Sequence, residues 1–193
     1  MEWIAQFIDR HIIDADDRAV ARGLVLTISQ GGAAGATAYL EACRVLGEAA
    51  GDIDQLLTDI STQESSDPVA RVGMLISTSF ARVRAEYPSR PDAQRAREAL
   101  ASMADETVDE AGERFGADLH SWLIQIVGEA VSQISAVAAN RSPLVRVETG
   151  ISLPSSLLAY DLYEDPERGA EIVARSRSGT PLVMPVRFEA LAS

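Results

Sequence analysis

The sequence predicts a mainly α-helical protein, a helical bundle followed by a small β-α-α-β module at the C-terminus. Apolar residues recur at steps of three and four over most of the first 140 residues, which is typical of the buried stripes of bundle helices. Helix-capping residues, glycines and prolines separate these stripes. Beyond residue 142 the pattern changes to two short strand-like segments, the first of them alternating, on either side of two helical stretches.

The predicted bundle covers residues 1–142, with a further boundary at the polar connector 61–67. Its helices follow from apolar stripes that begin at Trp3, Val20, Ala36, Ile53, Val69, Ala96 and Phe115. Several boundaries follow from capping signals, because Asp is a good N-cap and Pro fits the first helical turn. These signals are the acidic run Asp14–Asp17, Asp52 with Gln55 three residues later, and Asp67-Pro68.

The predicted C-terminal module covers residues 143–193. Alternation over 144–149 predicts its first strand, and Leu153-Pro154 and Asp165-Pro166 each begin a helix. Residues 182–189 predict its last strand, at an edge of the sheet because Pro185 cannot donate a ladder hydrogen bond. An exposed strand edge can pair with a neighbouring chain.

Composition indicates a globular protein with an acidic surface. The 193 residues carry a formal net charge of −12, and all 17 basic residues are dispersed arginines. Nucleic acids and anionic membranes attract clustered Lys and Arg, so we expect neither direct nucleic-acid binding nor a membrane partner. The single cysteine, Cys43, excludes an intrachain disulfide and fits assembly in a reducing cytoplasm.

The glycine-rich segment Gly31–Ala36 is the sequence feature nearest to a ligand-binding motif. It follows Leu24–Ile28, which could be a strand, and precedes a helix, as in a dinucleotide-binding turn. The surroundings do not alternate between strands and helices, so a joint between two helices is the favoured interpretation. Binding of a nucleotide or another small molecule at this turn stays open as an alternative.

Other reactive residue types have plain structural interpretations. Cys43 fits a small buried residue, His120 a rim position, and the run after His11 a helix cap. The carboxylates at 105–106 and 109–110 fit a solvated helix face. We therefore expect no catalytic residue, no cofactor and no metal, and we predict that the protein is not an enzyme.

Two segments carry a resemblance to a known family. Leu153–Arg175, with its leucine-rich helix, Leu-Tyr pair and Glu-Ile-Val run, and the joint Tyr87–Ala93 resemble the helical C-terminal region of phage Mu-type DNA circularisation proteins. The resemblance covers roughly residues 67–193. It implies that the chain corresponds to the C-terminal half of those proteins, existing as a separate protein.

The same tail resembles the LysM-like modules of phage tail and baseplate proteins. Ala159, Tyr160, Tyr163, Asp165 and Ile172 match the order of residues in those modules. Glu164 and Ser176 stand where the Mu-type family prefers Gly and Asn. In phage tail proteins such a module acts as a structural adaptor, whereas in cell-wall proteins it binds sugar.

The resemblance implies a structural component of a contractile phage tail or baseplate, or of a phage-like particle. It would be made in the host cytoplasm and assembled as several copies in a ring, near the hub or the distal tail protein. The candidate docking residues are Tyr160, Tyr163, Asp165, Arg168, Leu182, Val183, Val186 and Phe188. Binding of peptidoglycan or another carbohydrate by the LysM-like tail, and a role as a tail-assembly chaperone, are the alternatives.

Overall fold

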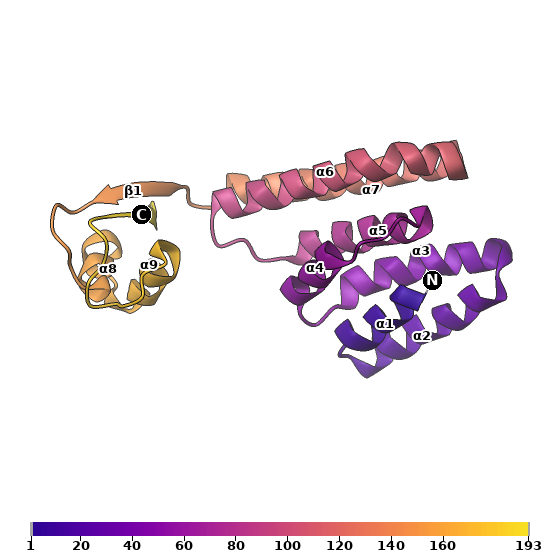
Figure 1. Cartoon of the computed structure of the whole chain (residues 1–193), viewed down its shortest axis with the longest axis horizontal. Coiled ribbons are helices and arrows are strands. Elements are labelled where there is room, and N and C mark those ends of the chain that lie inside the picture. The colour runs from indigo at the N-terminus through magenta and orange to yellow at the C-terminus, as the bar shows by residue number, and fades with distance from the viewer. Residues whose placement is uncertain (1, 193) are drawn as a thin grey trace. The chain divides into compact units, whose positions relative to one another are not determined.

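The computed structural model describes residues 2–192, and it confirms a mainly helical protein with a small two-stranded antiparallel sheet near the C-terminus (Figure 1). The chain divides into two compact units. The first comprises Met1–Glu86 and Gln94–Ala136, and the second comprises Tyr87–Ala93 and Val137–Ser193.

The second unit includes residues that the sequence assigned to the bundle, namely 87–93, which span the end of a loop and the first turn of the next helix, and the end of the last bundle helix. The Arg90 backbone N–H donates to the Ser142 carbonyl at 3.1 Å. The Arg90 guanidinium reaches the Ala139 carbonyl at 3.5 Å. These contacts tie the loop to the segment that leads into the small sheet.

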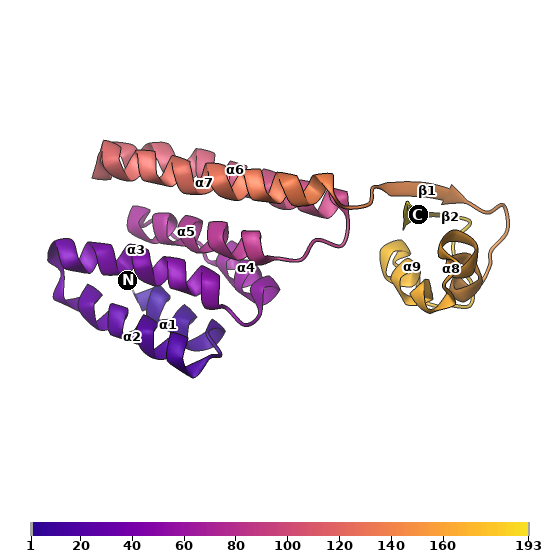
Figure 2. The ribbon, with the colours of Figure 1, turned by 180° about the vertical axis from the view of Figure 1, so that it is seen from behind.

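Five helices precede the loop, and two long ones follow it. They are α1 (Glu2–His11), α2 (Ala15–Gln30), α3 (Gly32–Ala49), α4 (Ile53–Thr62), α5 (Pro68–Arg84), α6 (Arg90–Phe115) and α7 (Ala117–Ala139). In both views α2 lies along α3, and α6 lies along α7 (Figures 1 and 2). The first unit is therefore built largely from antiparallel helix pairs joined by short turns.

The predicted caps are confirmed. The Asp14 carboxylate accepts from the N–H groups of Asp16 and Asp17, and Asp67 accepts from Val69 N–H. The Asp52 carboxylate accepts from Gln55 N–H at 2.9 Å. The Gln55 amide donates to Asp59 rather than back to the cap, so only half of the predicted capping box forms.

Two helix boundaries differ from the prediction. The third helix begins at Gly32 rather than Ala36, because Gly31 and Gly32, with positive φ angles of 73° and 66°, complete the α2–α3 turn. Phe115 ends α6 instead of starting the following helix, because the chain turns at Gly116 with a φ of 97°. A left-handed conformation of this kind suits glycine.

The core of the first unit lies where α3 crosses α5. Gly47 and Gly73 allow a close approach there: a Cβ atom at Gly73 would overlap Tyr39 Oη and lie 2.8 Å from Cys43 Sγ. Tyr39 Oη donates to the Val69 carbonyl at 2.7 Å and accepts from Trp3 Nε1 at 3.3 Å. The buried hydroxyl is thus satisfied, as burial of a polar group requires.

The second unit contains β1 (Leu144–Glu148), α8 (Ser155–Tyr163), the 3₁₀ helix η1 (Pro166–Arg168), α9 (Gly169–Ser176) and β2 (Arg187–Leu191). The strands are antiparallel, with Val147 opposite Phe188. Its core cluster comprises Leu158, Ala159, Ile172, Met184, Phe188 and Ala190.

The predicted last strand, 182–189, is wrong in extent. The strand begins only at Arg187, and residues 181–186 run as an irregular segment. Pro181 and Pro185 have no N–H to donate to a regular ladder. The Met184 N–H donates to the Leu153 carbonyl at 3.1 Å, so the segment is held by the loop before α8.

Candidate interaction surface

Exposed apolar side chains concentrate in the second unit. Seven of the twelve large exposed hydrophobic residues of the described chain lie there, although this unit is the smaller one. They are Val145, Ile151, Leu157, Tyr160, Leu182, Val183 and Val186. Single exposed apolar residues are normal, but a contiguous group marks an interaction site.

Four of these residues lie on two neighbouring segments. Residues 149–155 and 181–186 run antiparallel, held by backbone bonds from Thr149 N–H to Val186 O (3.0 Å) and from Ser155 N–H to Pro181 O (2.7 Å). Ile151, Leu182, Val183 and Val186 are 64%, 71%, 62% and 41% exposed, and we call these four residues the loop patch.

Two buried residues anchor the segments that carry the loop patch. Leu153 packs against the core cluster and Met184 is 1% exposed, so these two residues bury their side chains inside the unit. Val183 follows Leu182 and directly precedes Met184, so on an extended chain it points to the side opposite the buried Met184. Both segments are anchored by backbone hydrogen bonds, so the patch is part of an ordered surface.

Of the predicted docking residues, Tyr160 is exposed and Tyr163 is not free. Tyr160 is 57% exposed on α8. Tyr163 packs against the core cluster, and its hydroxyl accepts from Leu191 N–H at 2.9 Å. The Arg168 guanidinium lies 3.6 Å from the centre of the Tyr163 ring. Tyr163 therefore connects α8, η1 and β2.

The other predicted docking residues divide in the same way. Asp165 caps η1 by accepting from Glu167 N–H at 2.9 Å, and Arg168 also donates to Glu171. Phe188 is 5% exposed and belongs to the core cluster. Leu182, Val183 and Val186 lie in the loop patch, which the structure completes with Ile151. The sequence signal for Ile151 is an apolar residue directly after Gly150, outside any predicted element.

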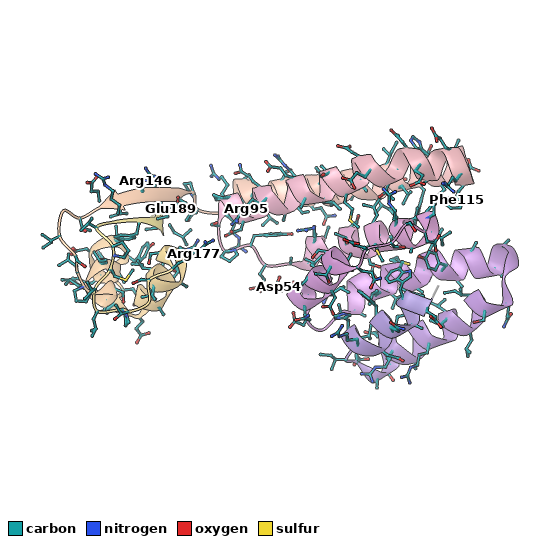
Figure 3. All side chains as sticks on the ribbon, viewed as in Figure 1. Asp54, Arg95, Phe115, Arg146, Arg177 and Glu189 are labelled. Carbon is teal, nitrogen blue, oxygen red and sulfur yellow. The ribbon has the colours of Figure 1, made fainter. Side chains whose placement is uncertain are left out.

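Charge distinguishes the two units. The first unit has ten arginines and 21 acidic residues, a net charge of −11, whereas the second has seven and eight, a net charge of −1. On the sheet, Arg146 and Glu189 are register partners (Figure 3). The apolar loop patch therefore belongs to the unit with almost no net charge, where long-range repulsion of another acidic protein is weak.

The structure also places the residues that were considered for chemistry. The segment Leu24–Ile28 is part of helix α2 and Gly32–Ala36 form the start of α3, so the glycine-rich segment joins two helices at Gly31, in line with the favoured interpretation. Cys43 is fully buried, and burial raises the pKa of its thiol to about 12. His120 is half-buried, 3.7 Å from Asp109. Within residues 2–192, no group of three or more His, Cys, Asp or Glu side chains could hold a metal ion.

One described helix, α7, is long and apolar enough to cross a membrane by length and composition alone. Helices of soluble bundles pass the same test, and α7 carries Asp118 and Glu129. Helix α7 also packs along α6, because a Cβ atom added at Gly112 of α6 would lie 2.8 Å from the His120 ring of α7.

Neither the known protein-family models nor the curated proteins contain a match to this chain. The likeness to the Mu-type and LysM-like proteins therefore depends on the quoted residues alone.

Proposed function

We propose that this protein is a structural component of the tail or baseplate of a contractile phage or phage-like particle, and that it acts through protein–protein contacts. The single observation that carries the proposal is the loop patch, four exposed branched aliphatic side chains on two hydrogen-bonded segments. Burial of such side chains contributes about 25 cal/mol per Å² of apolar area removed from water.

The location of the loop patch supports this proposal. It lies in the unit whose residues resemble the adaptor modules of tail proteins, and that unit carries little net charge. The strongly acidic first unit suits a particle component that must not adhere to packaged DNA, because phosphates repel carboxylates. In this proposal the partners are the hub or the distal tail protein, with several copies of the chain in a ring.

The proposal is tested by quantitative mass spectrometry of purified particles from the organism that encodes the chain. We expect the chain in the particles at several copies per tail, in a fixed ratio to the tail proteins. Its absence from finished particles together with its presence on unassembled tail proteins would indicate an assembly chaperone and contradict the proposal.

A carbohydrate-binding role makes a different prediction. In that case purified peptidoglycan would retain the chain, and substitution of Tyr160 would reduce that retention. We expect no retention by peptidoglycan, because Tyr163 and Arg168 are engaged with each other and with other parts of the unit. Retention would contradict the proposed structural role.

A further inference from the structure

The first unit contains an apolar cavity that the proposed docking function does not use. It has a volume of about 460 Å³. The cavity lies where the α2–α3 joint meets the start of α5 and the turn between α6 and α7, and Figure 3 labels Phe115 at that turn. The side chains on its wall include those of Ile28, Ala36, Leu40, Val72, Phe115 and Leu119.

Glycines form one wall of this cavity. Gly31, Gly32 and Gly35 all contribute to it without side chains. A Cβ atom added at Gly31 or Gly32 would find no atom within 4 Å, so the space beside the joint is open. Both residues have positive φ angles, 73° and 66°, which other residue types rarely adopt. The turn that joins the two helices therefore also keeps the wall free of side chains.

The wall offers a ligand no charge and no free hydroxyl. None of the described residues that line the cavity is charged. Among these lining residues, Tyr39 has a polar side-chain group. Its hydroxyl donates to Val69 O and accepts from Trp3 Nε1. A polar ligand would find no side-chain hydrogen-bond partner on this wall, and burying its polar groups there costs free energy. An apolar ligand incurs no such penalty and gains from leaving water.

We infer that this cavity binds a small uncharged apolar molecule, such as an alkyl chain or an aromatic hydrocarbon. Its volume falls within the range of small-molecule sites, about 300–1,000 Å³. Gly31, Gly32 and Ala36 are exposed at its edge, so a ligand can enter from solvent without a change of fold. A second copy of the chain is a poor occupant, because two first units of net charge −11 repel each other.

The test is a titration of the full-length chain with N-phenyl-1-naphthylamine, an uncharged probe whose fluorescence rises in apolar surroundings. We expect saturable binding of one probe per chain and displacement by 1-decanol. Ala36→Trp places an indole on the cavity wall and should weaken binding at least tenfold. Ala36 is solvent-exposed, so the variant is expected to fold, as circular dichroism would verify.

The matched control is Thr37→Trp. Thr37 is the next residue of α3, is exposed and does not line the cavity. The affinity of the Thr37→Trp variant for the probe should therefore stay within twofold of that of the unmodified chain. Non-saturable binding, or equal binding by the two tryptophan variants, would overturn the inference. A dimer in light scattering that dissociates with Ala36→Trp would assign the cavity to a second copy and would also overturn it.

Discussion

At the scale of single residues, close packing at α3 and α5 depends on the absence of a side chain at Gly73. The positions of Tyr39 and Cys43 leave no room for a methyl group there. Both neighbours are fixed, Tyr39 by its hydrogen bonds and Cys43 by complete burial. The same crossing has a second tight position at Gly47, where a Cβ atom would lie 2.8 Å from Phe80 Cβ.

We predict that Gly73→Ala lowers the free energy of unfolding by about 1–3 kcal/mol, the usual cost of overpacking a core. Gly23→Ala is the matched control, because Gly23 lies within helix α2 and a Cβ atom there would meet nothing within 4 Å. That control should gain about 0.5–1 kcal/mol from the higher helix propensity of alanine. Urea denaturation measures both, and equal stability of the two variants would contradict this account of the helix crossing.

His11 is a second residue whose environment has a measurable consequence. It is 3% exposed, and its Nε2 lies 3.1 Å from Asp59 Oδ2, which also pairs with Arg10 at 2.9 Å. Burial lowers the pKa of His11 below its usual value of 6.5, and its effect exceeds the opposing attraction of Asp59. The folded state therefore favours the neutral imidazole.

The unfolded chain protonates His11 more readily than the folded chain does. The stability that the neutral, buried imidazole contributes is therefore fully present above pH 6.5 and is lost as the pH falls from 6.5 toward the lowered pKa of the folded state. The loss is at most about 1.4 kcal/mol per pH unit. We predict that His11→Gln shows a smaller loss of stability than the unmodified chain between pH 7 and pH 5. His120 is present in both proteins and cancels in the comparison. Identical pH dependence would contradict the assignment to His11.

At the scale of elements, α8 and β2 are connected through Tyr163. Its hydroxyl accepts from the N–H of Leu191, the last residue of β2, and its ring lies under Arg168 of η1. Tyr160, one turn earlier on the same helix, is exposed. The two tyrosines that the sequence grouped as one docking face therefore have different environments.

Tyr163→Phe removes the acceptor and leaves the Leu191 N–H without this partner, so we expect a loss of about 1–2 kcal/mol in the stability of the second unit. Tyr160→Phe should change it by less than about 0.5 kcal/mol, as for other exposed positions. Thermal unfolding followed by near-UV circular dichroism would measure both. A larger loss for Tyr160→Phe than for Tyr163→Phe would reverse the roles assigned here.

Local chemistry made most elements predictable. Asp14, Asp52 and Asp67 mark helix starts because an Asp side chain satisfies free N–H groups wherever it precedes a helix. The extent of β2 was not predictable in this way. Residues 182–186 are an apolar run that resembles a buried strand, but their hydrogen-bond partners are Thr149 and Leu153, distant in sequence in the loop before α8. Only the tertiary structure determines that pairing.

At the scale of the whole molecule, the candidate site was predictable only in part. Leu182, Val183 and Val186 were predicted to be exposed because the sequence placed them on an edge strand. They are exposed, but they lie on an irregular segment that pairs with residues 149–155. Phe188 was grouped with them because it shares their segment, yet the β1–β2 register turns it into the core. The cavity at Gly31–Ala36 depends on α5 and on the α6–α7 turn, which are distant in sequence.

The central claim is that the loop patch attaches the chain to its particle. The most direct measurement is the amount of chain in purified particles after the Leu182→Asp/Val183→Asp double substitution. The control is Ala170→Asp/Ala174→Asp, which adds the same charge at exposed positions of α9. We predict that the loop-patch variant is depleted at least tenfold from particles, because burying two carboxylates in an apolar contact is costly. The control should be incorporated normally. Equal incorporation of both folded variants would contradict the claim.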